Sequence, residues 1–367
     1  MFQLFHPVDI KFGEGLIGDL RMLLKDYEGL SFVLVSGQSQ EKNGVLEIIQ
    51  SQISNQIVDT IIGIEENPTV ENVDEIINTV VESEADALIG IGGGSVMDAT
   101  KVAAIGAKMH LSAREVLDTT ERMRLPLILI PTTSGSSSEV TSSAVISDPS
   151  IERKIPINGR EVFADLAIVD PELTYTLPQS VTAISGIDII CHAFDAIGNN
   201  KHNPYSDALA VEALKLAFKH LKPVYLKEEY REGRHALSLA TMLVGQAFSQ
   251  TGTSGSHAVS YYLTAHFGIP HGEACALTAD LWYKLNSKMD SRLVDISKSL
   301  GFRDVDAMLS HFNQLKKDIG LRTTFEELGI SKKHLRDIAR DALLQNNMNN
   351  SMVQLNEDAL VELLKRK

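Results

Sequence analysis

The chain has 367 residues with an apolar content of 44% and a charged content of 22%, as expected of a globular protein large enough for two domains. Its formal net charge of −14 argues against a nucleic-acid partner, and its two cysteines, Cys191 and Cys275, are too few for a disulfide framework. The N-terminus lacks the pattern of a signal peptide, and no apolar run is expected to reach the length of a membrane span. We therefore expect a cytoplasmic protein with neither a nucleic-acid nor a membrane partner.

Strand-like and helix-like stretches alternate in the first half of the chain. Apolar runs predict strands at 30–37, 58–64, 125–134 and 166–174, and helical spacing of apolar residues predicts helices at 44–53 and 70–83. The stretch 85–106 runs from a strand through a glycine turn into a helix. This alternation predicts a parallel sheet covered by helices.

From about residue 178 the pattern becomes helical almost throughout. Hardly any β-rich run interrupts the apolar periodicity, and only the stretch 345–351, before a last predicted helix, is compositionally biased. We therefore predict two domains, an α/β domain at 1–178 and an all-α domain at 179–367.

Four potential metal ligands lie in the second half. Asp188 and His192 are four residues apart in a helical stretch, so both side chains project from one face. His257 follows in GSHAVSYY, and His271 lies in a Pro-His-Gly turn. A single histidine in a helix is more often ordinary packing, but one carboxylate and three imidazoles together suit Fe²⁺ or Zn²⁺. We expect these four residues to bind one such ion.

The glycine turn of the first half is suited to a phosphate. Gly92, Gly93, Gly94 and Ser95 follow a strand and open a helix, where backbone N–H groups are available to an anion. The pattern is not the G-x-G-x-x-G fingerprint, so a tight turn without a ligand is the alternative. Asp98, one turn into the helix, either serves this site or stabilises the first turn through the helix dipole.

Two further loops are expected at the same edge of the sheet, because ligands gather at the carboxyl ends of parallel strands. Thr132, Thr133 and Ser136 lie in a Ser/Thr-rich loop directly after a buried strand. Gly37 and Ser39 follow the first buried strand, where a ribose is often bound, and no acid stands there to repel a 2′-phosphate. This favours NADPH over NADH. A solvated connector and a plain turn are the respective alternatives.

Taken together, these stretches resemble the iron-containing (group III) alcohol dehydrogenase family over essentially the full length. The motifs are FGEG, GGGSxxDxxK, TTSGxxSEVT, VDPEL, GIDxxxHA and HAxxxxLxxxFxIPHG, in this order. The resemblance implies a dehydroquinate synthase-like fold, with a nucleotide-binding α/β domain and a helical domain that binds metal and substrate. It also implies a set of site residues: Asp188, His192, His257 and His271 for the metal, Gly94 and Ser95 for the pyrophosphate, and Thr132, Thr133 and Ser136 beside the nicotinamide.

Three departures from the family pattern bear on the chemistry. The loop contains Gly135-Ser136-Ser137 where members usually have Gly-Thr-Gly or Gly-Thr-Ala. Gly37 stands where NAD-preferring members often have Asp. Tyr261 stands where many members have a histidine thought to relay a proton. We take Tyr261, together with His266 before the Pro-His-Gly turn, as the catalytic candidates.

These features predict a metal-dependent NAD(P)H alcohol dehydrogenase that acts as an aldehyde reductase, with the metal stabilising the alkoxide. The wording of 257–277 is similar to the branch that reduces phosphonoacetaldehyde to 2-hydroxyethylphosphonate. Lys154 and Lys201 are candidates for contact with such an anion, and Lys154 also for contact with the cofactor. The expected partners are a small aldehyde or alcohol and, in a homodimer, a second copy of the chain.

Three alternatives remain open at this point. A general short-chain alcohol dehydrogenase would have the same site without an anion contact. A dehydroquinate synthase-type lyase would need several cationic phosphate anchors in the helical domain, and the sequence shows no such cluster. A non-catalytic nucleotide sensor would bind metal and cofactor without turnover.

Overall fold

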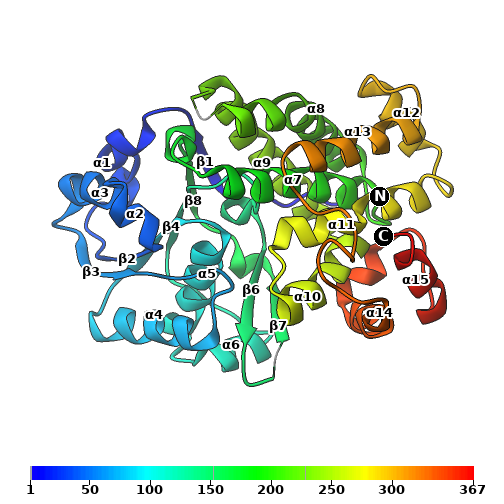
Figure 1. Ribbon diagram of the computed structural model, residues 1–367. Helices are drawn as coiled ribbons and strands as arrows, with labels where there is room; N and C mark the ends of the chain where they lie inside the picture. Colours follow the sequence, from blue (N-terminus) through cyan, green and yellow to red (C-terminus); the bar gives the residue numbers. More distant parts are fainter. Residues whose placement is uncertain (1, 152, 228) are drawn as a thin grey trace. The chain divides into compact units, whose positions relative to one another are not determined.

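The computed structural model describes residues 2–151, 153–227 and 229–367. The chain forms two compact units (Figure 1). The α/β unit comprises His6–Thr133 and Ser137–Tyr175, and the helical unit comprises Thr176–Lys367, Ser134–Ser136 and the segment that ends at Phe5. The main division therefore falls after Tyr175, where the sequence predicts a boundary after residue 178. The two short segments from the first half that belong to the helical unit lie outside the predicted division.

The core of the α/β unit is a six-stranded sheet in which every pair of neighbours is parallel. In spatial order its strands are β1 (Asp9–Phe12), β8 (Leu166–Val169), β5 (Leu127–Pro131), β4 (Ala87–Gly92), β2 (Phe32–Ser36) and β3 (Ile57–Ile62). The predicted parallel sheet is confirmed. Because β3 continues outward from β2 and β5 continues outward from β4, the winding reverses between β2 and β4. In sheets of this kind, ligands bind at the carboxyl ends of the strands that flank such a reversal.

Helices cover both faces of the sheet, which explains the nearly unbroken apolar runs of its central strands. Leu34, Ile89 and Ile128 lie on one face and cluster with Ile49. A Cβ on Gly90 would point to the opposite face, where it would meet Thr100 of α5. The helices of this unit are α1 (Leu20–Leu23), α2 (Gln38–Lys42), α3 (Val45–Ile53), α4 (Val70–Glu82), α5 (Gly94–Met109) and α6 (Ala113–Asp118).

Three strands lie outside the predicted elements. β1 has four residues of mixed polarity and pairs at one edge of the sheet. β6 (Ser143–Asp148) and β7 (Arg153–Asn158) pair antiparallel in a separate two-stranded sheet. An edge strand or a hairpin buries less of its surface than a central strand, so it lacks the continuous apolar run that makes a central strand recognisable. In β6, buried and half-buried residues only alternate.

Helices make up most of the second unit, as predicted. They are α7 (Gln179–Ile197), α8 (Pro204–Leu226), α9 (Arg231–Thr251), α10 (Gly255–Phe267), α11 (His271–Asn286), α12 (Arg292–Ser299), α13 (Val305–Asp318), α14 (Leu335–Leu344) and α15 (Glu357–Leu364). The biased stretch 345–351 contains a short 3₁₀ turn at Asn346–Asn350 and precedes α15. The predicted fold class, an α/β unit with a parallel sheet and a helical unit, is confirmed.

Helix α7 is the central helix of the helical unit and packs against α8, α9 and α11. Among the described residues it is the one helix, at 19 residues, that is long and apolar enough to cross a membrane by length and composition. This differs from the expectation that no run reaches that length. Within its apolar window, 78% is buried inside the structure, so α7 has the burial of a core helix.

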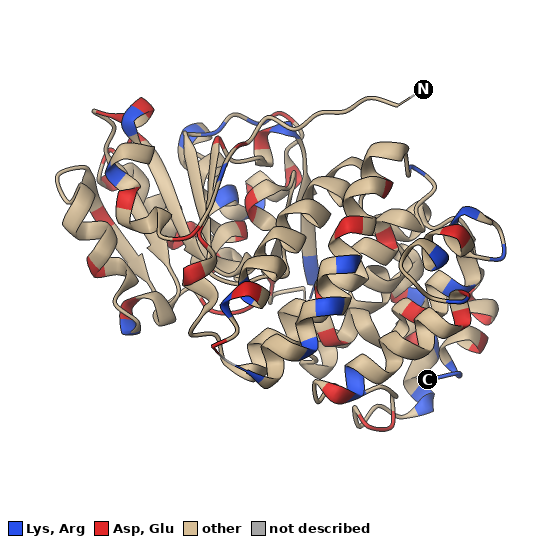
Figure 2. Cartoon of the chain, turned by 90° about the horizontal axis from the view of Figure 1, so that it is seen from above, with Lys and Arg blue, Asp and Glu red and all other residues tan. Residues whose placement is uncertain are grey.

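Charged residues are dispersed over both units. In the view of Figure 2, segments with Lys or Arg and segments with Asp or Glu occur on helices and loops of both units. The net charge of −14 is therefore spread over many sites, and the expected lack of a nucleic-acid partner stays a prediction.

Candidate functional site

Helix α7 carries the first two predicted ligands. Asp188 and His192 lie one turn apart, and each is only 4% exposed. Nδ1 of His192 is 3.6 Å from Oδ2 of Asp188. The His192 ring stacks on the ring of His257, with 4.5 Å between centroids, and on Phe248 of α9, with 4.3 Å. The i, i+4 spacing therefore places both side chains on one face, as predicted.

The other two predicted ligands lie at the beginnings of α10 and α11. His257 is in the first turn of α10, and His271 is the first residue of α11. Gly272 allows α11 to approach α7 closely, because a Cβ at this position would lie 2.0 Å from the carbonyl oxygen of Ile184 and 3.2 Å from Cβ of Asp188. The absent side chain of residue 272 is thus what lets His271 stand beside Asp188.

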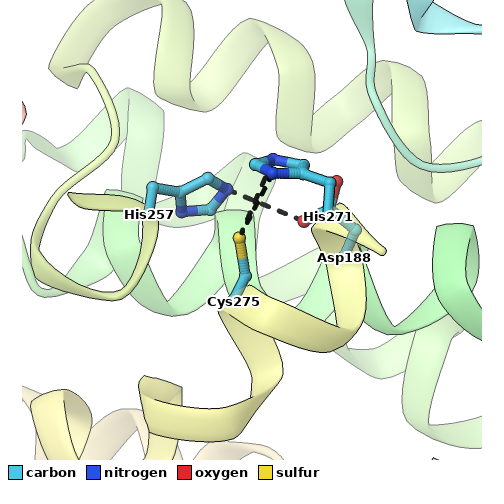
Figure 3. Close-up of side chains that lie close together, drawn as sticks. All are labelled: Asp188, His257, His271 and Cys275. Carbon is cyan, nitrogen blue, oxygen red and sulfur yellow. Dashed lines mark hydrogen bonds and ion pairs between the residues drawn. The ribbon is translucent and has the colours of Figure 1, made fainter. Parts of the chain in front are cut away.

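Four side chains converge in the helical unit (Figure 3). Potential ligand atoms of Asp188, His257, His271 and Cys275 all lie within 4.8 Å of one another. His192 lies directly beside this group through its contacts with Asp188 and His257. The structure therefore gathers all four predicted ligands and adds Cys275. The signal for Cys275 was present in the sequence as an i, i+4 spacing from His271.

A second carboxylate, Asp195, holds the His257 ring. Its Oδ2 accepts hydrogen bonds from Nδ1 of His257 at 2.7 Å and from the backbone N–H of Ser254 at 2.7 Å, and its Oδ1 accepts one from Ser256 at 2.8 Å. Nδ1 of His257 therefore carries the proton, and Nε2 is the atom available toward Asp188. Asp195 is not among the residues predicted from the sequence, although it lies seven residues after Asp188, two turns along the same face of α7.

Several buried polar atoms in this region have no hydrogen-bond partner among the described residues. They are Oδ1 of Asp188, Nδ1 of His192 and Nε2 of His257. A buried polar atom left without a partner costs roughly 1–3 kcal/mol, and a carboxylate costs more. A divalent cation bonded to these atoms removes that cost, so the donor set fits a metal ion.

Burial and neighbouring charges also shift the pKa values of these groups. Burial lowers the pKa of His192 to about 4. Burial opposes ionisation of Asp188, but His192, His271 and His257 outweigh it and hold the pKa of this carboxyl well below its ordinary value. Burial likewise opposes protonation of His257, but Cys275 and Asp195 outweigh it and raise its pKa. A metal ion would meet an ionised carboxylate here and would compete with a proton on His257.

The two catalytic candidates occupy different faces of α10. Tyr261 follows His257 by one turn and is half-buried. His266 follows His257 by nine residues, which is about 180° around a helix. Its side chain is exposed, and its ring lies 4.1 Å from the ring of Tyr262. The structure thus places Tyr261 on the same face of α10 as the predicted ligand His257 and places His266 on the opposite face.

In the α/β unit, the glycine turn begins α5. Gly93 is the residue before the first turn, and no side chain caps the N–H groups there. The hydroxyl of Ser95 accepts a hydrogen bond from the backbone N–H of Asn67, and the amide oxygen of Asn67 accepts one from Lys154 Nζ at 2.5 Å. The predicted residues Gly93, Ser95 and Lys154 therefore lie together, with a cation beside the uncapped helix start.

The loops after β2 and β5 lie next to this turn. Nε2 of Gln40, in the helix that follows Gly37, donates to Oγ1 of Thr132 at 3.1 Å. A Cβ on Gly93 would touch Thr133 at 3.6 Å. Gly37 is buried and Ser39 is exposed. The sheet topology thus brings three of the predicted cofactor loops to one edge of the α/β unit.

Asp98 has a role in the fold that the sequence analysis did not assign. Its two oxygens accept hydrogen bonds from the Ser138 hydroxyl at 2.6 Å and from the backbone N–H of Val145 at 2.9 Å. One turn later, Nζ of the buried Lys101 donates to the carbonyl oxygens of Thr141 and Ser143. This pair fastens the segment 138–145 to α5, so Asp98 positions this segment, and its contact with a cofactor stays a prediction.

Ser134–Ser136 belong to the helical unit. The hydroxyl of Ser134 is 3.1 Å from that of Ser238 in α9, and a Cβ on Gly135 would lie 2.5 Å from the carbonyl oxygen of Ser185 in α7. Ser136, which the resemblance places beside the nicotinamide, therefore belongs to the same unit as α7 and α9. Thr132 and Thr133 belong to the unit that contains the sheet.

The donors around Lys201 are largely engaged in the fold. The Asn199 side chain donates to the carbonyl oxygen of Gly252, and that of Asn200 donates to the carbonyl oxygen of Asn349. The side chain of Asn203 caps the start of α8. Lys201 itself is exposed. This segment serves mainly to join α7 to α8.

Known families match both parts of the chain. The model of the iron-containing alcohol dehydrogenases matches residues 7–171, and the C-terminal model of the Fe-containing alcohol dehydrogenase family matches residues 182–367. Alcohol dehydrogenase 4 of Schizosaccharomyces pombe is 30% identical over 331 residues, which cover 88% of this chain and 78% of that protein. The NADPH-dependent butanol dehydrogenase of Clostridium saccharobutylicum is 30% identical and covers 92% of this chain and 89% of its own length.

Solved structures agree with these matches. The sulfoacetaldehyde reductase of Bifidobacterium kashiwanohense, determined in complex with NAD⁺, is 30% identical, with a TM-score of 0.95 over 100% of this chain and 98% of that one. The fold, the converging donors of the helical unit and the two family models thus point to the same relatives. The chain belongs to the iron-containing alcohol dehydrogenase family and is an oxidoreductase that interconverts an alcohol and an aldehyde.

Proposed function

We propose that Asp188, His192, His257 and His271 hold one divalent metal ion, Fe²⁺ or Zn²⁺, in the helical unit. The observation that carries this proposal is the convergence of these side chains, in which Asp188, His192 and His257 each have a buried polar atom without a hydrogen-bond partner among the described residues. The reaction is the reduction of a short aldehyde by NADPH or NADH.

When bound, the metal supplies a Lewis acid for the carbonyl oxygen, and the nicotinamide supplies the hydride. The residues of the chain bind and orient these groups. Asp195 fixes the orientation of His257, and the uncapped start of α5, with Lys154 nearby, receives the cofactor phosphates. The phenol of Tyr261, one turn after His257, is the candidate proton donor for the product alcohol.

The proposed substrate is a small aldehyde that carries a sulfonate or a phosphonate, such as sulfoacetaldehyde or phosphonoacetaldehyde. The support is the similarity to a sulfoacetaldehyde reductase over nearly the whole of both chains. A general short-chain alcohol dehydrogenase is the second candidate, favoured by the similarity to a butanol dehydrogenase.

A comparison of kcat/KM separates these two candidates. With metal-loaded enzyme, kcat/KM for sulfoacetaldehyde or phosphonoacetaldehyde should be at least tens-fold higher than kcat/KM for propanal. The reason is that each charge-assisted hydrogen bond to the anion contributes about 1.5–3 kcal/mol before the cost of desolvation. Lys201→Ala and Lys154→Ala identify which lysine contributes to this advantage. Equal or better activity on propanal would rule out the anionic substrate and leave a general alcohol dehydrogenase.

We further propose a preference for NADPH. Gly37 follows β2 at the reversal of winding, and no acidic side chain stands at this position. Gly37→Asp should weaken NADPH binding and shift the ratio of kcat/KM values toward NADH. The added Cβ would lie 3.0 Å from Oε1 of Gln40, a flexible side chain that can move. An unchanged ratio would show that residue 37 lies away from the ribose.

Two expectations from the sequence remain predictions, the homodimer and the cytoplasmic location. Sedimentation of the purified protein at micromolar concentration measures the first, and fractionation of the source cells measures the second.

A further inference from the structure

The asparagine-rich stretch 345–351 is distinguished in the sequence only by its composition, but in the helical unit it binds a distant loop. Its 3₁₀ turn, Asn346–Asn350, lies between α14 and α15. Nδ2 of Asn347 donates a hydrogen bond to Oγ1 of Thr253 at 3.2 Å, and Nδ2 of Asn350 donates one to the carbonyl oxygen of Thr253 at 2.9 Å. Thr253 belongs to the loop that joins α9 to α10, so the turn holds this loop through two side-chain amides.

The loop 252–254 lies outside any helix or strand, so its contacts with other segments determine its course. Gly252 has a φ of 78°, in the left-handed region that favours glycine. A Cβ at this position would lie 2.8 Å from Nδ2 of Asn350, so the bare glycine also leaves room for that amide. The carbonyl oxygen of Gly252 accepts a hydrogen bond from Nδ2 of Asn199, just after α7, at 3.0 Å. Amide donors from two different segments therefore fix the loop.

The same loop leads directly into the turn of α10 that carries His257. The backbone N–H of Ser254 and Nδ1 of His257 both donate to Oδ2 of Asp195, each at 2.7 Å. Nε2 of His257 then lies 3.6 Å from Oδ1 of Asp188 (Figure 3). A displacement of the loop would pull Ser254 away from Asp195 and turn the imidazole ring. The position of Nε2 therefore depends on where Thr253 is held.

The asparagine-rich stretch is also fastened to the end of α7. The backbone N–H of Asn200 donates to the carbonyl oxygen of Asn350 at 2.8 Å, and Asn199 and Ser351 form an isolated antiparallel bridge. Asp195 lies in the last turn of α7, just before this contact. The helix that carries Asp195 and the loop that leads to its partner are thus both attached to one stretch, which fixes the distance between them.

We propose that Asn347 and Asn350 are positioning residues for the proposed metal ligand His257, and that they act through Thr253 and Asp195. The proposal rests on the proposed metal site and deepens it. Loss of the two amides leaves the ligand set complete but less well ordered, so the metal binds more weakly and is not lost. One neutral hydrogen bond corresponds to about two- to tenfold in an equilibrium constant, and groups that orient a metal ligand contribute about 10–100-fold in affinity, so loss of both amides should cost about 10-fold.

The test is the dissociation constant of the purified protein for Zn²⁺, measured by competition with a chromophoric chelator. The double variant Asn347→Ala/Asn350→Ala should bind Zn²⁺ about 10-fold more weakly than the wild type. Asn346→Ala/Asn349→Ala replaces two exposed asparagines of the same turn and is the matched control, which should bind as the wild type does. Asn356→Ala removes the cap of α15 and lowers the thermal midpoint, but it should also keep the affinity.

A double-mutant cycle tests the route through Asp195. In the Asp195→Asn background, where the support of His257 is already weakened, the further change Asn347→Ala/Asn350→Ala should alter the dissociation constant very little. Two independent effects on Zn²⁺ affinity would instead multiply. A general loss of stability would not produce this coupling.

Each outcome decides one of the two proposals. Wild-type affinity in the folded double variant, an equal loss of affinity in Asn356→Ala, or multiplied effects in the Asp195→Asn background overturns the positioning role and leaves the proposed function intact. Failure of the wild type to bind Zn²⁺ or Fe²⁺ overturns the metal site and the positioning role with it.

Circular dichroism establishes that each variant is folded. If the double variant does not fold, Thr253→Val takes its place, because it keeps the volume of the side chain and removes only the hydroxyl that Asn347 contacts. Its Zn²⁺ affinity should fall by about two- to tenfold, the contribution of one neutral hydrogen bond. An unchanged affinity in Thr253→Val would overturn the positioning role in that case.

Discussion

The two polar centres of this chain are built in opposite ways. In the α/β unit, the loops after β2, β4 and β5 offer mainly backbone N–H groups, small hydroxyl side chains and glycines. In the helical unit, carboxylate and imidazole side chains from α7, α10 and α11, all buried except the half-buried His271, converge on one space. Binding by backbone N–H groups needs residues without bulky side chains, so that a ligand can come close. Binding by side chains is lost when a single donor side chain is removed.

Buried carboxylates show the same contrast. Asp195 in the helical unit is 2% exposed; burial alone would raise its pKa, but His257 and the hydrogen bonds from Ser254 and Ser256 lower it below the ordinary value. Glu139 in the α/β unit is 1% exposed, and neither of its oxygens has a hydrogen-bond partner among the described residues. Burial therefore raises the pKa of Glu139 to about 7. Partners, not burial, decide which carboxylate stays ionised.

The largest effect should come from removal of one donor of the helical unit. The His271→Ala variant should bind little metal, and its kcat/KM should be about 100- to 1000-fold lower than that of the wild type. The reason is that stabilisation of the alkoxide by a Lewis acid is worth several kcal/mol. Metal content per chain and aldehyde turnover measure this. His311→Ala, which removes an exposed histidine of α13, is the control and should retain both. Full metal content and turnover in His271→Ala would refute the ligand set.

A pair of glycine substitutions sharpens the comparison. Gly272→Ala should lower the free energy of unfolding by about 3 kcal/mol, because its Cβ would meet the backbone of α7 at 2.0 Å. Gly93→Ala places its Cβ at an ordinary 3.6 Å from Thr133, so the thermal midpoint should hardly change while KM for the nucleotide rises. Equal losses of stability in the two variants would show that the glycine turn of the α/β unit is a packing site as well.

The buried carboxyl group of Glu139 should make stability depend on pH. Its pKa rises from 4.5 in the unfolded chain to about 7 in the fold, so the folded state holds an extra proton between these values. Its contribution to stability is therefore lost as pH rises through about 7, and amounts to about 3 kcal/mol. Glu139→Gln lacks this loss. Urea unfolding should show the stability of the variant relative to the wild type increasing from pH 5 to pH 8, and a constant difference would argue against a buried neutral glutamic acid.

The smallest effect should follow from a substitution of Asp195, which orients the proposed ligand His257. Asp195→Asn keeps the shape of the side chain but removes its negative charge and replaces one of its two acceptor oxygens with an NH₂ donor. The hydrogen bonds from His257, Ser254 and Ser256 can then not all be kept, so metal affinity should fall by about 10–100-fold. Competition with a chelator measures the affinity. Added metal should restore turnover in Asp195→Asn, whereas His271→Ala should remain inactive at the same concentration. A variant that binds metal as tightly as the wild type would show that the other contacts of His257 suffice.

The sequence predicted the features that rest on local patterns. Continuous apolar runs identified the central strands, and the spacing of Asp188 and His192 identified a shared helix face. Asp195 follows His192 by three residues and Cys275 follows His271 by four, so both share a helix face with a predicted ligand. Spacing alone does not say which residues on a face meet another helix. That depends on packing, such as the close approach of α11 to α7 at Gly272.

The role of Asp98 depends on tertiary contacts in the same way. Nothing in GGGSVMDATK indicates that its carboxylate is engaged by Ser138 and Val145, far along the chain. The hairpin of β6 and β7 was obscure because its two strands contain few fully buried residues. Local sequence patterns therefore predicted where the loops lie along the chain. They did not predict which polar side chains form hydrogen bonds within the protein.

The interleaving of the two units has a consequence for recombination of this gene with its homologues. A fragment that starts at Thr176 lacks Phe5, whose backbone is hydrogen-bonded on both sides to the side chain of Gln250, and Ser134, whose hydroxyl meets that of Ser238. With one crossover in the middle of the gene, residues 176–367 of the helical unit would come from one homologue. The segment that ends at Phe5 and the segment Ser134–Ser136, which belong to the same unit, would come from the other. A functional chimera needs matching residues in all three segments, so the two units are inherited as one module.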